Sequence, residues 1–311
     1  MQKKQVFVIH HSVDFDGIFC REIARHYFES KPDYAVEYIG WNYGEPAPVV
    51  PASVMMLYML DVSVPELMEH PRLIWIDHHA TAIEKHPESI KGYRLDGVAA
   101  CRLAWQWFAW CGNDACLLPV AANLPRKKDY ISRLVREPAA VRLAGEYDVW
   151  DKRDPNAELL QHGLRTCEPQ YGILLGGNGA YLARLFMDGE KLAFAREREN
   201  ASIIADFGFD VCFEGLRFLA CNAPRCNSLL FAAELIPAHD GCLAFRFDGK
   251  AGHWTVSLYG VPSKPEIDLS AIAKKYGGGG HKQACGFQCR ELPFELPGAR
   301  AEHAGMEGGA E

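Results

Sequence analysis

Three separated segments of this chain carry residue types that could bind metal ions or phosphate groups. They are HHSVDFDG at 10–17, IDHHAT at 76–81 and GGGGHKQACGF at 277–287. The first two place histidine and aspartate at the ends of apolar runs, and the third is a run of glycines before a histidine. Imidazole combined with several carboxylates suits a borderline-hard ion such as Mn²⁺, Mg²⁺ or Co²⁺. Together, the segments suggest a phosphoesterase with two metal ions and a second domain that holds its substrate.

The first segment places one histidine and two aspartates just beyond a predicted strand. His10, Asp14 and Asp16 have the spacing H-x3-D-x-D and follow the apolar run 6–9. Sites in open α/β sheets form at the carboxyl ends of strands, so these side chains can converge on one ion. An Asp-rich turn before a helix also serves as a helix cap, and that is the alternative for both aspartates.

Two further apolar runs also end in acidic or imidazole residues. Asp61 follows MLYML, and Asp77, His78 and His79 follow LIWI. Capping alone would explain an aspartate, but it would not require histidine at two strand ends. Two ions about 3.5–4 Å apart, with one bridging carboxylate, would need roughly this number of ligands. Such a pair could activate a water molecule for in-line hydrolysis of a phosphoester.

A fourth acidic segment, GEYDVWD at 145–151, offers one more ligand. Asp148 is the candidate, and Glu146 and Asp151 are its rivals. All three carboxylates lie just after a helix predicted over 129–144, so the sequence leaves this choice open.

The glycine-rich segment has the properties of an anion-binding loop. Four glycines at 277–280 permit positive φ angles, their N–H groups can surround a phosphate, and His281 adds a donor. The segment lacks the ending of a Walker A loop, and it is not a G-x-G-x-x-G turn after a first strand. A flexible turn is the simpler alternative.

Arg225 and Asn227, in the same half of the chain, could either cap a following helix or contact a phosphate.

Length and composition predict a two-domain protein of the cytoplasm. The chain has 311 residues, which exceeds the usual size of one core. Its net charge of −7 argues against long duplex nucleic acid as a partner, although bound cations would still admit a short anionic substrate. Eleven cysteines without C-x-x-C pairs are typical of reduced thiols. We expect no membrane partner, because no apolar run is long enough for a signal peptide or a bilayer span.

The order of predicted elements indicates an α/β fold. Strand-type segments at 6–9, 35–39, 54–60 and 73–76 alternate with helix-type segments, which favours a mainly parallel sheet. We therefore expect a mainly parallel N-terminal domain over 1–187, a connecting helix over 188–207 and a smaller α/β domain over 208–296. A disordered tail is expected over 297–311. The active site is expected in the cleft between the two domains.

These motifs resemble those of the DHH phosphoesterase family. Asp77-His78-His79 corresponds to the signature that names the family. The GGGGH segment is similar to the glycine-rich signature of the DHH-associated C-terminal domain, and both occur in the expected order over about residues 5–290. The resemblance implies two lobes around a cleft and a two-ion centre that usually holds Mn²⁺.

The resemblance also implies roles for individual residues. The ligands implied for one ion are His10, Asp14 and Asp61. Those implied for the other ion, with Asp61 as the bridge, are Asp16, Asp61, His78 and Asp148. On the catalytic side, His79 would lie near the scissile phosphate and Asp77 would orient the histidine pair. In the second domain, the groups that would face a substrate phosphate are Gly279, Gly280 and His281.

Two segments depart from the oligoribonuclease-like members of the family. Val13-Asp14-Phe15-Asp16 stands where those members often have Pro-Asp-Gly-Asp, and GEYDVWD differs from their Asp-Thr-Gly pattern. The metal chemistry is unaffected by these differences, but the assignment of substrate is weakened.

We therefore predict a Mn²⁺-dependent phosphodiesterase or phosphatase that acts on short oligonucleotides or small nucleotide phosphates. An exopolyphosphatase or pyrophosphatase could use the same centre, although it should carry more Lys and Arg around its anion pocket. Two further candidates are a nucleotide-binding regulatory protein without turnover and a hydrolase with a single zinc ion. The sequence leaves open whether the protein is a homodimer.

Overall fold

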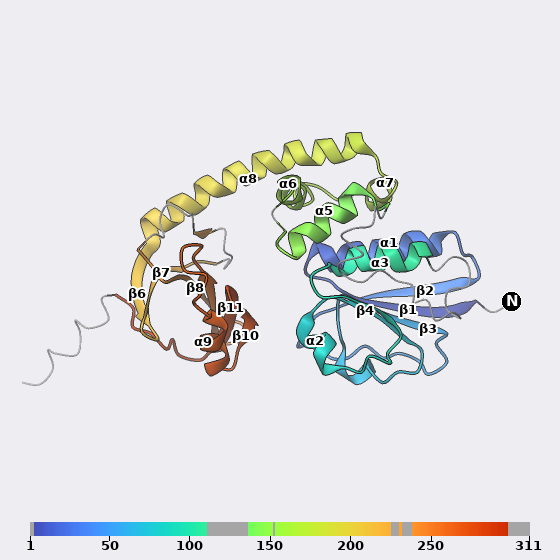
Figure 1. The fold of residues 1–311 in the computed structure, drawn as a ribbon, viewed down its shortest axis with the longest axis horizontal. Helices are drawn as coiled ribbons and strands as arrows, with labels where there is room; N and C mark the ends of the chain where they lie inside the picture. The colour runs from blue at the N-terminus through green and yellow to red at the C-terminus, as the bar shows by residue number, and fades with distance from the viewer. Residues whose placement is uncertain (1–2, 111–135, 152, 225–229, 232–237, 298–311) are drawn as a thin grey trace, which may run out of the picture. The chain divides into compact units, whose positions relative to one another are not determined.

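The computed structural model describes residues 3–110, 136–151, 153–224, 230–231 and 238–297. The chain divides into two compact units, Met1–Ala193 and Phe194–Glu311, and each is described by itself (Figure 1). No helix in the described ranges is both long and apolar enough to cross a membrane.

The first unit is built on a five-stranded sheet in the order β2-β1-β3-β4-β5, in which every pair of neighbours is parallel. Its strands are β1 (Lys4–His11), β2 (Tyr34–Trp41), β3 (Met56–Leu60), β4 (Leu73–Asp77) and β5 (Gly92–Arg94). Every residue of β3 and β4 is buried, as expected for inner strands covered on both faces. The predicted α/β class and parallel sheet are therefore confirmed. The short edge strand β5 has no apolar run, and sequence reasoning missed it.

The helical elements described in this unit are η1 (Pro65–Leu67), α1 (Phe15–Glu29), α2 (Ala80–Lys85), α3 (Ala100–Trp110), α5 (Ala139–Asp148), α6 (Asn156–Gly163), α7 (Tyr171–Leu175) and the first part of α8 (Gly179–Phe207). Among them, α1 and α3 pack directly on the sheet, and α5 and α7 pack on α1. Alternate residues of β1 enter two separate cores, because successive side chains of a strand point to opposite faces. Val6 and Val8 pack with α1, α3 and α5, whereas Phe7 and Ile9 pack against the other face. Figure 1 shows α1 and α3 side by side along one face.

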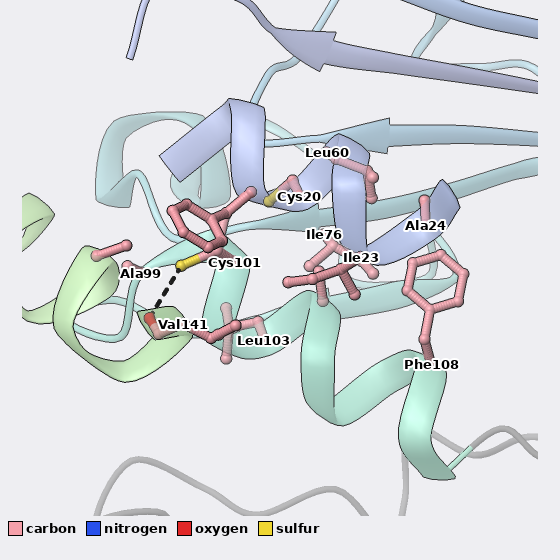
Figure 2. Packing of buried hydrophobic residues seen from close by; sticks show 14 of the residues in the cluster. Cys20, Ile23, Ala24, Leu60, Ile76, Ala99, Cys101, Leu103, Phe108 and Val141 are labelled. Carbon is pink, nitrogen blue, oxygen red and sulfur yellow. Dashed lines mark hydrogen bonds between the residues drawn. The ribbon is translucent and has the colours of Figure 1, made fainter. Parts of the chain in front are cut away.

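The core between α1, α3 and α5 is closely interlocked (Figure 2). Ile23 of α1 and Leu103 of α3 are buried there, and the Cys101 thiol donates a hydrogen bond of 3.6 Å to the carbonyl oxygen of Val141 in α5. This packing holds α1, α3 and α5 together. Asp14 and Asp16 lie at the start of α1 and Asp148 is the last residue of α5, so the packing positions three residues of the candidate site.

The second unit contains a six-stranded mixed sheet in the order β10-β11-β9-β8-β7-β6. Its elements are β6 (Gly208–Phe213), β7 (Leu216–Asn222), β8 (Gly241–Asp248), β9 (His253–Gly260), α9 (Leu269–Lys275), β10 (Gly279–His281) and β11 (Ala284–Cys289). Only β7 and β8 pair in parallel. The largely apolar stretch 211–220 is not a single strand, because it contains a hairpin. Glu214 and Gly215 turn the chain with φ angles of +52° and +76°, as a two-residue turn requires.

The helix predicted over 188–207 starts earlier than expected, since α8 runs from Gly179 to Phe207 and crosses the division between the two units. The GGNG break in the sequence at 176–179 directly precedes it. Two other predictions, the first part of the helix over 129–144 and the tail over 297–311, lie wholly or mostly outside the described residues. The segment 228–235, whose sequence has a helical pattern, also lies mostly outside them.

Candidate metal centre

The carboxyl ends of three adjacent strands carry the acidic and imidazole residues of the first unit. His11 is the last residue of β1, Asp61 follows β3, and His78 and His79 follow β4. These strands are neighbours in the order β1-β3-β4 and run in parallel, so their ends meet at one edge of the sheet. The topology therefore brings together residues that are far apart in the sequence.

Three overlapping groups of ligand-type side chains lie at this edge, and in each group the ligand atoms are within 4.8 Å of one another. The groups are His11, Asp14 and Asp61; Asp61, His78 and His79; and Asp16, His78 and Asp148. Asp61 belongs to two groups and His78 to two. The residues therefore form one continuous cluster.

The distances within this cluster match those between ligands of a shared ion. His11 Nδ1 lies 2.9 Å from Asp14 Oδ2 and 3.6 Å from Asp61 Oδ2. Neighbouring ligand atoms around an octahedral ion with bonds of about 2.1 Å are about 3 Å apart. This end of the cluster could close around an ion with small movements.

The other end of the cluster is centred on His78. Its Nε2 lies 3.1 Å from Asp148 Oδ2, 3.5 Å from Asp61 Oδ1 and 3.6 Å from Asp16 Oδ2. Three carboxylates and one imidazole therefore surround a second position. Asp61 contributes one oxygen to each end, as a bridging carboxylate would.

His11 joins the cluster, although the sequence analysis named its neighbour His10. His10 is 2% exposed, lies outside the three groups and donates its Nδ1 proton to the carbonyl oxygen of His11 at 2.8 Å. Burial lowers the pKa of His10 to about 4, so its imidazole is neutral. The difference arises from strand alternation, because the two side chains leave β1 on opposite sides. The sequence signal for His11 was the pattern H-x2-D-x-D, which His11, Asp14 and Asp16 form.

The two aspartates of the first segment are held by helix ends. Asp14 is the N-cap of α1, and its Oδ1 accepts a hydrogen bond from Gly17 N at 3.0 Å. Its Oδ2 faces His11, so one side chain both caps the helix and belongs to the cluster. Asp16 is 1% exposed and accepts the N–H groups of Ala100 and Cys101 at 2.9 and 2.8 Å, at the start of α3. A helix N-terminus favours a carboxylate there.

Asp61 has a backbone conformation that aims its side chain into the cluster. Its φ angle is +62°, in the left-handed region where aspartate is tolerated better than most residues. The side chain is 2% exposed. Asp61 Oδ1 and His11 Nδ1 are buried, yet neither makes a well-aligned hydrogen bond within the described part of the chain. Buried polar atoms are rarely left without partners, and an ion at each end of the cluster would supply a partner for each of these atoms.

Asp148, rather than its rivals, faces the cluster. It is the last residue of α5, and its carboxylate lies beside His78. Glu146 pairs with Arg142 at 2.8 Å, and Asp151 pairs with Arg153. Each rival carboxylate is therefore engaged elsewhere.

Burial and mutual repulsion raise the pKa values of two carboxyl groups of the metal-free cluster, those of Asp16 and Asp148. Burial raises the pKa of Asp16 well above its usual value, and the charges of Asp61 and Asp148 raise it further. Burial likewise raises the pKa of Asp148 to about 7, against the opposing charge of His78. A divalent cation would oppose both shifts, because it stabilises the ionised carboxylates.

Two imidazoles of the cluster also have raised pKa values, but here the cause is the carboxylates beside them. The adjacent carboxylates of Asp14 and Asp61 raise the pKa of His11 to about 10. Burial lowers the pKa of His78, but its three neighbouring carboxylates outweigh burial and raise that pKa to about 10. The cluster therefore favours positive charge, which is the condition a cation site must meet.

In the second unit, the glycine run forms a hairpin instead of an open loop. Gly279 and Gly280 lie in β10, which pairs with β11, and His281 is exposed at its end. A Cβ on Gly278 would lie 2.1 Å from the carbonyl oxygen of Gly286, whereas a Cβ on Gly279 would meet nothing within 4 Å. A hollow of about 770 Å³ lies beside this hairpin, lined by the glycines and by residues of β9 and β11. The predicted phosphate contacts Arg225 and Asn227 lie outside the described residues.

No family model and no curated protein sequence matches this chain. Among solved structures, the DHH domain of a member of the s1p family of ribosomal proteins is similar. It has a TM-score of 0.50 and 13% identity, over 91% of this chain and 82% of that one. An exopolyphosphatase-related protein from Bacteroides fragilis has a TM-score of 0.48 and 14% identity, over 93% and 88%. A pGpG-specific phosphodiesterase from Vibrio cholerae has a TM-score of 0.42 and 14% identity, over 92% and 93%. At these identities, the likeness bears on the fold alone.

Proposed function

Because this chain has the fold of a DHH-domain protein, we propose that its acidic and imidazole cluster is the active site of a metal-dependent phosphoesterase. The observation that carries this proposal is the shared position of Asp61. Its two oxygens face two separate sets of ligand-type atoms, with His11 on one side and His78 on the other. A carboxylate in that position is the central element of a site for two ions.

The cluster contains the residues needed to hold two ions. One would be held by His11, Asp14 and Asp61, and the other by Asp16, Asp61, His78 and Asp148. This set has two imidazoles, four carboxylates and no thiolate, which favours Mn²⁺, Mg²⁺ or Co²⁺ over an ion selected by sulfur. We propose Mn²⁺. Two such ions would supply a nucleophilic hydroxide near neutral pH and would neutralise charge on a transferring phosphoryl group.

His79 would transfer a proton to the leaving group, and Asp77 would orient His79. Asp77 is fully buried and accepts the Nδ1 proton of His79 at 2.8 Å. The Nε2 atom of His79 is consequently the one available to a substrate, and the side chain is 40% exposed. We infer that His79 is the catalytic residue at the scissile ester and that Asp77 positions it.

We propose short oligonucleotides or small nucleotide phosphates as substrates. The hairpin of the second unit supports this choice, because its glycine backbone and His281 can contact a single phosphate group. The proposed contacts are Gly279, Gly280, His281, Arg225 and Asn227.

A metal-binding and product analysis tests the proposed function. Purified protein freed of metal is titrated with Mn²⁺ and then assayed on di- to pentanucleotides, pyrophosphate and polyphosphate. We expect two ions per chain and release of mononucleotides. Asp61→Asn, the matched control, should lose at least one ion and nearly all turnover. One Zn²⁺ per chain, or full activity in Asp61→Asn, would contradict the proposal, and phosphate release from only the inorganic substrates would overturn the choice of substrate.

A further inference from the structure

The helix α8 presents two large apolar side chains to solvent. Met187 and Phe194 are each 61% exposed. The other side of the helix is packed within the chain, since Leu185 is 1% exposed and a Cβ on Gly189 would lie 2.0 Å from the carbonyl oxygen of Leu159 in α6. Leu185 and Phe194 are about two and a half turns apart, so their side chains leave opposite sides of the helix. Phe194 therefore lies on the solvent-facing side of α8.

Phe194 is the centre of a stripe that runs along this side of the helix. The other members lie 4, 7 and 11 residues before and after it, and residues at these spacings fall on one face of an α-helix. Those before it are Ala183, Met187 and Glu190, those after it are Arg198, Ala201 and Ala205, and all are exposed. We call this set the α8 stripe. It is about 33 Å long and apolar except for one acid and one base.

The α8 stripe is complementary to itself under two-fold symmetry. If a second α8 lies antiparallel with its Phe194 at the same level, each position before Phe194 meets the position equally far after it. Glu190 of each copy then meets Arg198 of the other copy, and the large Met187 meets the small Ala201. Such reciprocal contacts are the property of an interface between two identical chains.

The same charges disfavour a parallel pair of helices. In that arrangement Glu190 would meet Glu190 of the second copy, and Arg198 would meet Arg198. Like charges placed opposite each other at an interface oppose association. The order of the two charges along the stripe therefore selects the antiparallel direction.

Both charged side chains of the stripe are available to a second copy. Within the part of the chain that the structure describes, neither Glu190 nor Arg198 has an ion-pair partner, whereas Asp188 of the same helix pairs with Arg184 and Lys191. The Arg198 guanidinium lies 5.9 Å from the centroid of the Phe194 ring. That contact still leaves the Phe194 side chain mostly exposed and the guanidinium without a carboxylate.

We propose that the α8 stripe binds the α8 stripe of a second copy of this chain, forming an antiparallel dimer whose two-fold axis passes beside Phe194. Burial of apolar surface from both copies favours the association, and the two Glu190–Arg198 pairs set its direction and register. One pair of helices is a small contact, so the dimer forms in equilibrium with the monomer. This inference does not depend on the proposed phosphoesterase function.

Sedimentation equilibrium of the full chain with charge-reversed variants tests the dimer. Wild-type protein should dimerise with a Kd that Glu190→Arg and Arg198→Glu each raise about tenfold or more, because each places like charges opposite each other at two points. The variant with both substitutions should return to within about threefold of the wild type. An equal mixture of the two single variants should form a heterodimer, since the stripe of one then carries two positive charges and that of the other two negative charges.

A pair of adjacent substitutions controls for a general effect of charge on the helix. Phe194→Glu should abolish the dimer because it places two carboxylates together at the axis. Ala195→Glu adds the same charge about 100° around the helix, outside the stripe, and should leave Kd unchanged. Both residues are exposed, so Tm should stay within about 2 °C of the wild type.

Three results would overturn the inference. One is a wild-type protein that remains monomeric up to about 1 mM. Another is a dimer that Phe194→Glu leaves intact, because a different surface would then join the copies. The third is a double charge reversal that weakens the dimer as much as the single reversals do, since Glu190 and Arg198 would then not meet across the interface.

Discussion

Asp77 holds the Nδ1 atom of His79 at 2.8 Å with the same oxygen that accepts the backbone N–H groups of His78 and His79 at 2.7 and 3.0 Å. Its other oxygen accepts the indole N–H of Trp75 at 3.0 Å. Although burial raises the pKa of Asp77, these bonds from His79 lower it below the usual value. The ionised carboxylate is fully used by the protein. We therefore expect Asp77 to position the histidine pair and not to bind an ion.

Replacing Asp77 by Asn should reduce kcat while both ions remain bound. The amide keeps the shape of the carboxylate but cannot accept all of its hydrogen bonds, so His79 loses its fixed orientation. We expect a fall in kcat of about 10- to 100-fold, as is usual when the partner of a site histidine is removed. Steady-state kinetics and metal analysis check this, with His79→Ala as the control. Unchanged kcat in Asp77→Asn would show that this orientation has no catalytic importance.

The two adjacent histidines of β1 should respond differently to substitution. His11→Ala should lose affinity for one ion and nearly all activity, because its Nδ1 lies among the proposed ligand atoms. His10→Ala should keep both ions but lower the free energy of unfolding by about 2–3 kcal/mol, since it leaves a cavity at a buried position. Manganese titration and thermal unfolding of the two variants provide the comparison. The reverse pattern would restore His10 as the ligand.

Much of the first unit could be predicted from its apolar runs. MLYML and LIWID are strands buried on both faces, and such strands are continuous apolar segments in the sequence. Parallel strands end at the same edge, which is why Asp61 and His78 could be associated without a structure. The prediction of the site depended on the Asp and His residues that follow each strand as much as on the apolar strand itself.

The remaining features depend on contacts that a linear pattern does not contain. The choice between His10 and His11 depends on the direction of a side chain at the end of a strand. β5 has only three residues, and Gly92 with a φ angle of +137° is needed there because a Cβ would lie 1.8 Å from the carbonyl oxygen of Trp75. Neither the direction of the histidine side chain nor the short strand β5 produces a periodic pattern in the sequence. The hairpin at Glu214 was hidden for a similar reason, since its two strands follow one another almost without interruption.

The metal-free protein should lose stability as the pH rises from about 7 to about 9. In the folded chain, the pKa values of His11 and His78 are each raised to about 10 from 6.5. Above pH 6.5, the folded state therefore holds protons that the unfolded state has released, and stability falls with rising pH. Asp148, with its pKa raised from 3.8 to about 7, acts in the same direction, but mainly below pH 7. The lowered pKa of His10, about 4, affects stability only between about pH 4 and pH 6.5.

Thermal unfolding after chelation, measured at both ends of this pH range, checks the sign. We expect Tm to fall by several degrees in the metal-free protein. With Mn²⁺ the fall should disappear or reverse, because ions bind the deprotonated ligands. The His78→Gln variant, when free of metal, should show a smaller fall in Tm with rising pH. A Tm that rises with pH in the absence of metal would contradict the assigned charges.

Two neighbouring glycines of the second unit should separate folding from phosphate binding. Gly278→Ala would bring a Cβ to 2.1 Å from the carbonyl oxygen of Gly286 and 2.6 Å from Cβ of Phe287, so we expect a loss of stability of about 2 kcal/mol or more. Gly279→Ala meets nothing within 4 Å and should leave Tm within about 2 °C of the wild type. If the Gly279 backbone contacts a substrate phosphate, the added methyl group should still raise KM about five- to tenfold.

Thermal unfolding and steady-state kinetics of Gly278→Ala and Gly279→Ala test whether these glycines serve folding or phosphate binding. His281→Ala is the companion variant, since the exposed His281 should affect KM and leave metal content unchanged. An increase in KM for Gly279→Ala and His281→Ala without a change in Tm would support phosphate binding by the hairpin. If KM is unchanged in both while Gly278→Ala unfolds more easily, the glycines serve the close pairing of β10 with β11, and the phosphate must be held by other residues.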